Sequence, residues 1–160
     1  MRNQKARVHY QKTGKEKFKA PVCPYCGRVS VLRPAEYVHG ENIINPGENL
    51  YVCNGYPECD AYVGVIRGTR KPKGTLANGE LRHKRILAHR LMNQITEQGI
   101  MGRDAVYQWL AVRLNLAYED THIGYFSVEL CDKAIFSMKQ ALQHEKCKKE
   151  KAALEVERCA

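Results

Sequence analysis

Two short stretches, Cys23–Gly27 (CPYCG) and Tyr51–Gly64 (YVCNGYPECDAYVG), contain four of the seven cysteines in this 160-residue sequence. The first is a C-x-x-C turn, which offers two thiolates from one tight bend, and the glycine after it can adopt the positive φ that turns backbone N–H groups toward sulfur. In the second, a Gly-Tyr-Pro turn allows the longer loop to fold back. Zn²⁺ prefers four tetrahedral ligands, at about 2.3 Å when they are thiolates. The spacing predicts one structural zinc ion with the ligands Cys23, Cys26, Cys53 and Cys59.

Two other interpretations of these cysteines are four unrelated buried thiols and a redox pair in the C-x-x-C turn. No thioredoxin-like βαβ pattern surrounds that turn, however, and the second pair follows short strands. Four thiolates leave no open coordination position, so the expected ion holds the fold rather than activating water. About forty residues with few large apolar side chains need such an ion to offset the entropy lost on ordering.

The net charge of +9 is concentrated in two blocks. Residues 1–20 carry seven basic side chains and one acidic one, and residues 67–90 carry eight basic side chains and one acidic one. Such clustering is typical of proteins that contact phosphate or an acidic protein surface, although it also occurs in small basic proteins that are simply soluble. No run approaches the roughly 18 apolar residues of a membrane span, and no apolar stretch follows the basic N-terminus. We therefore expect a cytoplasmic protein with no membrane partner.

The predicted fold class is α+β, with a four-cysteine zinc ribbon of short antiparallel strands followed by a three-helix unit. Short β-type runs occur at 29–32, 36–39, 50–53 and 61–66. The period then changes, and helices are expected over 78–98, over 104–115 and after Ser127, which is a suitable cap. The expected organisation is a flexible basic arm (1–20), a zinc ribbon (21–74), a helical domain (75–143) and a charged helical tail (144–160).

The first expected helix separates apolar from basic side chains. Its predicted buried stripe consists of Leu81, Leu87, Ala88, Leu91, Met92 and Ile95. On roughly the opposite quadrant lie Arg82, Arg85, His89 and Asn93. This face could line a phosphate backbone or an acidic groove, and a solvated helix face would look the same. Tyrosines of the ribbon could stack unpaired bases or form the ribbon's own small core. The candidate partner-binding residues are Arg70, Lys71, Lys73, Arg82, Arg85, His89, Tyr25 and Tyr56.

The two cysteine stretches resemble the C-terminal zinc ribbons of bacterial type IA topoisomerases, in which a Y-P-x-C turn recurs and which bind single-stranded DNA. Here the insert between Cys26 and Cys53 is longer, there is one unit rather than a tandem series, and no topoisomerase catalytic body is present. A closer resemblance, over most of residues 21–136, is to a family of small phage and prophage zinc-finger proteins of unknown function. It rests on CPYCG, YVCNGYPECDAYVG, GTLANGELR, YQWLA and HIGYF. This resemblance implies a mobile-element origin, and small phage proteins of this kind include inhibitors of host defence such as anti-CRISPR proteins.

No Ser/His/Asp motif, phosphate-cradling glycine loop or H-x-E deaminase signature occurs in the sequence. We therefore expect a non-enzymatic binding protein with one structural Zn²⁺ and no small-molecule substrate. Its expected partner is nucleic acid, single-stranded DNA in particular, or a host nucleic-acid-handling protein such as a CRISPR nuclease. A basic inhibitor cannot mimic DNA in the positively charged channel of such a nuclease, so it would grip an acidic or apolar region elsewhere. The expected function is that of a phage or mobile-element protein acting on nucleic acid or on such a host machine, with counter-defence (anti-CRISPR) inhibition of an RNA-guided nuclease as its most specific form. The alternative is a single-stranded DNA-binding zinc-ribbon protein in phage replication, recombination or transcription.

Overall fold

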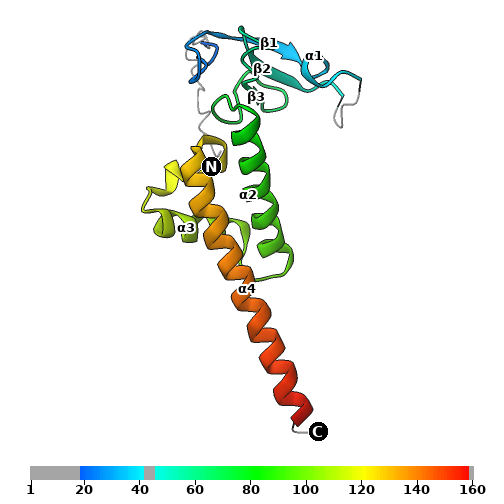
Figure 1. Ribbon diagram of the computed structural model, residues 1–160, viewed down its shortest axis with the longest axis vertical. Coiled ribbons are helices and arrows are strands. Elements are labelled where there is room, and N and C mark those ends of the chain that lie inside the picture. Colours follow the sequence, from blue (N-terminus) through cyan, green and yellow to red (C-terminus); the bar gives the residue numbers. More distant parts are fainter. Residues whose placement is uncertain (1–18, 42–45, 159–160) are drawn as a thin grey trace, which may run out of the picture.

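The computed structural model describes residues 19–41 and 46–158, and it places a small sheet at one end of a helical unit (Figure 1). The elements are β1 (Ser30–Pro34), α1 (Glu36–His39), β2 (Asn49–Cys53), β3 (Tyr62–Gly64), α2 (Gly79–Glu97), α3 (Arg103–Leu114), the 3-10 turns η1 (Tyr118–Asp120) and η2 (Ile123–Tyr125), and α4 (Val128–Arg158). This order confirms the predicted α+β class. The expected basic arm lies outside the described residues as far as residue 18.

The three strands form one antiparallel sheet in the order β1-β2-β3. Because successive side chains of a strand point to opposite faces, the central strand β2 contributes to two apolar clusters. Tyr51 and Cys53 pack with the turn that holds Cys23, whereas Leu50 and Val52 pack on the other side. The ribbon thus has a thin layer of apolar contacts on each face of its central strand.

The prediction of a strand over 36–39 is wrong, because these residues form the single helical turn α1. Pro34 ends β1, and it has no N–H group with which to extend a ladder. The next residue, Ala35, is buried, and its carbonyl oxygen accepts hydrogen bonds from the backbone N–H groups of Val38 and His39. Tertiary burial of Ala35 therefore overrides the β propensity of the tyrosine and valine that follow it.

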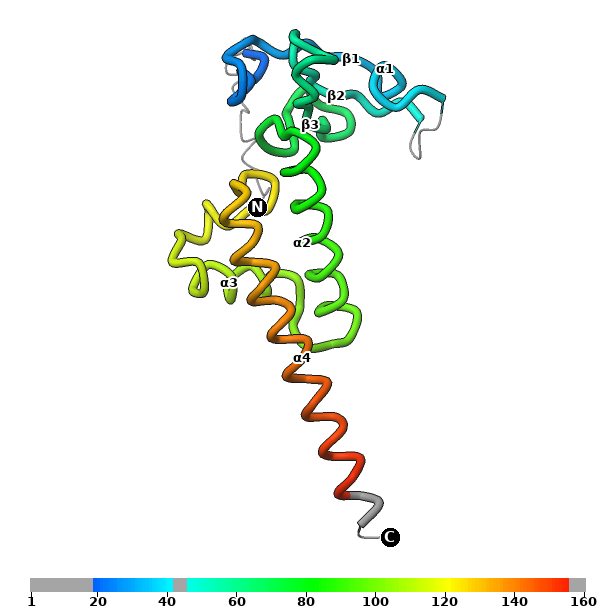
Figure 2. Tube along the Cα trace, viewed as in Figure 1, coloured from blue at the N-terminus to red at the C-terminus, as the bar shows by residue number. Residues whose placement is uncertain are grey.

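The helices begin where the sequence predicts. Asn78 caps α2, and its Oδ1 atom accepts a hydrogen bond from the backbone N–H of Leu81 at 3.0 Å. Ser127 caps α4 in the same manner through the N–H of Leu130, at 3.3 Å. Helices α2, α3 and α4 share one apolar core, and α4 then continues as a single helix beyond the end of α2 (Figure 2).

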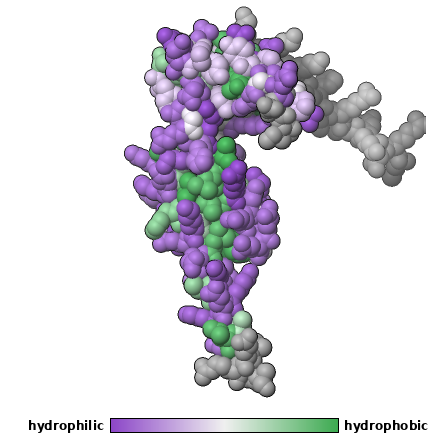
Figure 3. All heavy atoms as spheres, turned by 45° about the vertical axis from the view of Figure 1, so that its right-hand side comes forward, coloured by the Kyte–Doolittle hydropathy of each residue, from purple (hydrophilic) through white to green (hydrophobic). Residues whose placement is uncertain are grey.

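The helical unit leaves some apolar side chains in contact with solvent. A strip of apolar atoms runs along it on the face drawn in Figure 3, and the side chains of Ile86, Val112 and Phe136 are each more than half exposed. None of the helices among the described residues has the length and apolarity needed to cross a membrane. Ile86 also lines the cleft described below.

The ribbon packs directly on the helical unit through backbone contacts. The N–H of Thr75 donates to the carbonyl oxygen of Gly124 at 3.1 Å, and Tyr62 forms an isolated β-bridge with Ala77. Gly74 and Gly124 approach so closely that a Cβ atom on either one would collide with the backbone of the other segment. The segment after the ribbon and the turn before α4 therefore need glycine at their point of contact.

Candidate metal centre and basic cleft

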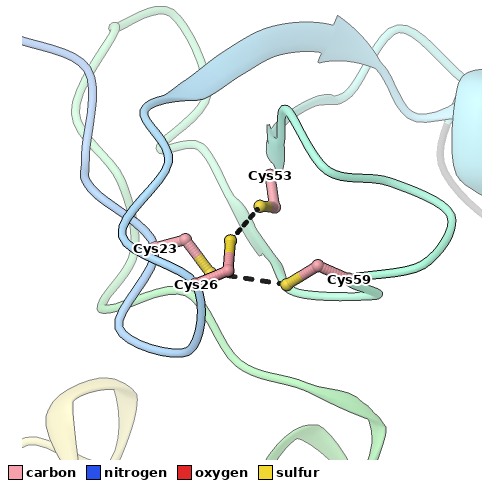
Figure 4. A group of neighbouring side chains, drawn as sticks. All are labelled: Cys23, Cys26, Cys53 and Cys59. Atoms are coloured by element: carbon pink, nitrogen blue, oxygen red, sulfur yellow. Dashed lines mark hydrogen bonds between the residues drawn. The ribbon is translucent and has the colours of Figure 1, made fainter.

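The four predicted zinc ligands converge at one end of the sheet (Figure 4). Cys23 and Cys26 lie in the turn before β1, Cys53 ends β2, and Cys59 lies in the loop before β3. All four sulfurs are within 4.8 Å of one another; the Sγ atoms of Cys23 and Cys59 are 3.6 Å apart, and those of Cys26 and Cys53 are 3.2 Å apart. A tetrahedral ion with Zn–S bonds of about 2.3 Å holds its sulfurs about 3.8 Å apart. The donor set and its spacing therefore fit Zn²⁺.

The backbone around the centre supports thiolate ligands. Gly27 has a φ of 70°, which closes the first turn, and the N–H of Gly55 donates to the Sγ atom of Cys53 at 3.4 Å. A backbone hydrogen bond from Arg28 lowers the pKa of Cys26 to about 7, whereas burial raises the pKa of Cys53 to about 12. Such a cluster does not hold four thiolates by itself, because burial opposes charge. A divalent cation supplies the compensating charge, and four thiolate ligands complete its coordination.

Arg82, which was expected on a partner-binding face, makes its contacts within the protein. Its Nη1 atom donates to the carbonyl oxygens of Asp60 and Ala77, each at 2.6 Å, and its Nη2 atom donates to the Asp60 carboxylate at 2.9 Å. The N–H of Gly79 donates to the same carboxylate at 2.8 Å. Asp60 directly follows the ligand Cys59, so this network joins the metal loop to the first turn of α2.

Arg85 was expected opposite the buried stripe of α2, and the structure corrects this. Its side chain is buried and donates to the carbonyl oxygen of Phe126 at 2.8 Å and to the carbonyl oxygen of Thr75 at 2.8 Å. At 100° per residue, a position four residues after Leu81 and seven before Met92 belongs to the stripe itself. Burial lowers the pKa of Arg85 from its usual value, and the carbonyl oxygens compensate the desolvated charge.

The two tyrosines expected to bind a partner lie outside the cleft described below. Tyr25 is 45% exposed, and its hydroxyl oxygen accepts a hydrogen bond from the N–H of Asn78 at 3.2 Å. Tyr56 is half-buried, packs beside the cluster of Leu50, and has its ring 5.6 Å from that of Tyr37. Of the two side chains expected to be exposed on the ribbon, Tyr25 is exposed and Tyr56 is only partly so.

The charged loop between β3 and α2 is an ordered hairpin tip. Val65 and Pro72 form a β-bridge, and inside it the N–H of Ile66 donates to the carbonyl oxygen of Lys71 at 2.9 Å. The Tyr51 hydroxyl fixes the tip by donating to the carbonyl oxygen of Arg70 at 3.0 Å. We call the three exposed cations of this hairpin the basic tip: Arg67, Arg70 and Lys71. Within the described part of the chain, none of the three forms an ion pair.

A cleft of about 760 Å³ lies between the ribbon, α2 and η2, and we call it the basic cleft. Its cationic and imidazole side chains come from four separate segments, and they are Lys73, Arg82, Arg85, His39, His89 and His122. Its aromatic and exposed apolar side chains include Tyr62, Tyr125, Ile66 and Ile86. No Asp or Glu side chain from residues 19–41 or 46–155 lines it. The arrangement suits an anionic ligand with a planar or apolar part.

The residues predicted from the sequence lie on one side of this cleft, and the other side was not predicted. Lys73, Arg82 and His89 were predicted as partner-binding residues, and the structure brings them together. Tyr125 ends η2 and His122 directly precedes it, more than thirty residues later in the chain, and no local pattern links them to the basic loop. Burial, aided by nearby positive charge and by His122, lowers the pKa of His89 and favours its neutral form.

A family model described as a zinc-finger-containing domain matches residues 19–141. The matched range contains the four cysteines, the basic tip and every side chain of the basic cleft, and it ends within α4. Neither a curated protein nor a solved structure matches the chain.

Proposed function

The chain belongs to this family of zinc-finger-containing domains, and on that premise we propose that it is a non-enzymatic binding protein for single-stranded DNA. The observation that carries the proposal is the basic cleft, whose lining brings cations, imidazoles and aromatic rings together and includes no carboxylate from the described residues. Glu48 and Asp60 pair with Lys73 and Arg82 from outside that lining. Cations bind phosphates, and their binding releases counterions from the strand. Aromatic rings bind unpaired bases by stacking, so the protein should bind single strands in preference to duplex DNA.

The zinc centre contributes to this function by holding the ribbon in place. Strand β3 leads from the metal loop to the basic tip, and Arg82 links the same loop to α2. The two walls of the cleft are therefore fixed relative to each other by contacts that depend on the folded ribbon. A preorganised cleft binds a flexible strand at a lower entropic cost than a cleft that must first assemble.

A second candidate function is inhibition of a host nucleic-acid-handling machine, such as an RNA-guided nuclease. The resemblance to phage and prophage proteins supports it, and so do the exposed side chains of Ile66 and Ile86 among the cations of the cleft. A mixed basic and apolar surface complements an acidic protein surface that has an apolar centre. In that case the basic tip would contact protein carboxylates in place of phosphates.

Fluorescence anisotropy with labelled single-stranded and duplex DNA, at about 50 and 200 mM salt, tests the proposal. We expect micromolar or tighter binding that prefers single strands and weakens steeply at the higher salt concentration. Reversing the charge of the basic tip (Arg67→Glu, Arg70→Glu, Lys71→Glu) should abolish binding at the higher salt. The matched control reverses three exposed cations of α4, Lys133, Lys139 and Lys149, which changes the net charge equally but away from the cleft.

Absence of binding at low salt would exclude single-stranded DNA as the ligand. The basic tip would then be assigned to an acidic protein surface, and capture of a purified RNA-guided nuclease, weakened by the same charge reversal, would support the second candidate. Equal weakening by the control variant would attribute the binding to net charge alone.

A further inference from the structure

We infer that the basic cleft accepts one unpaired base of the bound strand, stacked on the ring of Tyr125, while Lys73 and the basic tip hold the adjoining phosphates. The inference rests on the proposed function and adds the place and the manner in which a base is bound. Two tyrosines line the cleft, Tyr62 and Tyr125, and their rings have different surroundings.

The ring of Tyr62 already has a partner. The guanidinium carbon of Arg82 lies 3.8 Å from its centroid, and the imidazole of His39 makes a perpendicular contact with centroids 5.5 Å apart. A base that stacked on Tyr62 would have to displace the cation–π contact, and with it the hydrogen bonds from Arg82 to the metal loop. Tyr62 is therefore part of the wall and does not serve as the platform.

The ring of Tyr125, in contrast, is available for stacking. It is 56% exposed, and its one ring contact among the described residues is perpendicular, to His122, with centroids 6.1 Å apart. A perpendicular contact occupies at most one face of the ring, which leaves the other face without a ring partner among the described residues. His122 is itself held, because its ring stacks on that of Tyr107 at 5.7 Å.

The backbone holds this platform rigidly from both sides. The carbonyl oxygen of Gly124 accepts the hydrogen bond from Thr75, and the carbonyl oxygen of Phe126 accepts two from the buried guanidinium of Arg85. The N–H of Tyr125 itself donates to the carbonyl oxygen of His122 at 2.8 Å. An aromatic ring whose two neighbours are anchored loses little entropy when a ligand stacks on it.

The rest of the cleft suits the remaining parts of a nucleotide. Ile66 and Ile86 expose 45% and 51% of their surfaces, and a base would cover them. The Lys73 ammonium is 3.7 Å from the carboxylate of Glu48 in a half-exposed ion pair, which a phosphate can replace at little cost. An acidic peptide would satisfy the cations as well, but it would leave the Tyr125 ring without a planar partner.

The test compares two strands of equal length, an intact oligothymidylate and a fully abasic strand that keeps every phosphate. For the natural protein we expect the intact strand to bind at least about tenfold more tightly, because one stacked base is worth that much. In Tyr125→Ala the intact strand should lose about tenfold in affinity while the abasic strand is unaffected. The salt dependence of binding should not change, because the number of phosphate contacts is the same.

Two further variants separate stacking from damage to the fold. Tyr125→Phe keeps the ring and should bind the intact strand as the natural protein does. Tyr118→Ala removes a tyrosine of similar exposure from η1, outside the cleft, and should leave both strands unaffected. Thermal unfolding and zinc content of each variant confirm that the proteins compared are folded.

The possible failures are distinguishable. If the intact strand binds Tyr125→Ala as tightly as it binds the natural protein, this inference is overturned and the proposed function stands. An equal loss for intact and abasic strands in Tyr125→Ala would also overturn it, because the ring would then act on something other than a base. If neither strand binds the natural protein at low salt, the proposed function fails, and this inference fails with it.

Discussion

The guanidinium carbon of Arg82 lies 3.8 Å above the centroid of the Tyr62 ring, so a side chain of α2 rests on a side chain of β3. The same guanidinium donates to the carbonyl oxygen and the carboxylate of Asp60, the residue after the ligand Cys59. One side chain thus connects the helix, the sheet and the metal loop. Arg82 therefore lines the cleft as part of its wall, and Lys73 and the basic tip supply the cations that contact phosphate in the proposed mode of binding.

Removing this junction should destabilise the protein. We expect Arg82→Ala to lower the free energy of unfolding by about 2 kcal/mol, because it removes charge-assisted hydrogen bonds and a cation–π contact. Arg82→Lys should recover only part of this, because an ammonium cannot reproduce the planar fork that reaches two carbonyl oxygens. Urea unfolding of the zinc-loaded proteins measures the difference. Arg90→Ala, at an exposed site on the same helix, is the control. An equal effect of the two alanine variants would show that the contacts of Arg82 do not stabilise the fold.

The contact between Gly74 and Gly124 leads to a second prediction about stability. A Cβ atom on Gly124 would collide with the carbonyl oxygen of Lys73, so Gly124→Ser should cost about 1–3 kcal/mol of unfolding free energy. The same substitution at Gly102, the N-cap of α3, meets no atom within 4 Å and introduces a favoured cap residue. Gly102→Ser should therefore leave the stability unchanged or raise it. Thermal denaturation compares the two, and comparable melting temperatures would contradict the close approach.

The elements that the sequence predicted well depend on local chemistry. Zinc-ligand spacing identified the four cysteines, and the apolar period placed the first long helix at 78–98, against Gly79–Glu97 in the structure. Both signals come from residue types at short, fixed spacings: within each cysteine pair and along one face of a helix. The strand predicted over 36–39 failed because its conformation is set by Ala35, which is buried against β2.

The candidate site was harder to predict, because long-range contacts decide which cations are free. Arg82 and Arg85 look alike in sequence, yet Asp60 and Tyr62 engage the first, and the backbone carbonyl oxygens of Thr75 and Phe126 engage the second. The opposite wall of the cleft, with Tyr125, is supplied by a turn that long-range contacts hold beside the ribbon, among them the close approach of Gly74 to Gly124. Charge clustering therefore indicated the right region but not the residues that face a ligand.

Metal removal should unfold the ribbon and leave the helical core folded. The helical core contains only residues from Ala77 onward, whereas the ribbon's two apolar clusters are small and one of them includes three of the cysteines. Under a strong chelator, we expect hydrogen exchange to become fast in β2 and β3 and to stay slow in α2 and the first turns of α4.

Zinc content is a separate measurement of the same centre. The natural protein should bind one Zn²⁺ per chain, and Cys53→Ser should lose it together with the slow exchange of β2. Cys147→Ser, at an exposed position of α4 outside the cluster, is the matched control and should keep the ion. Retention of zinc and of slow exchange by Cys53→Ser would disprove the assignment.

His89 should make the stability of the protein depend on pH. Burial is the main cause of its lowered pKa, and the positive charge of Arg103, together with His122 and Arg85, acts in the same direction. The unfolded chain therefore takes up a proton near the ordinary pKa of 6.5, while the folded chain takes it up only at lower pH. The stability that neutral His89 provides is complete above pH 6.5 and is lost as the pH falls from there through the folded pKa.

The variant His89→Gln removes this titration and keeps a neutral polar side chain of similar size. Urea unfolding of both zinc-loaded proteins at about pH 7.5, 6.5 and 5.5 gives the difference in their unfolding free energies at each pH. We expect the natural protein to lose stability relative to His89→Gln as the pH falls below 6.5. The thiolates and the five other histidines are common to both proteins, so their titration largely cancels in the difference. A difference that stays constant over this range would show that His89 is as easily protonated in the cleft as in the unfolded chain.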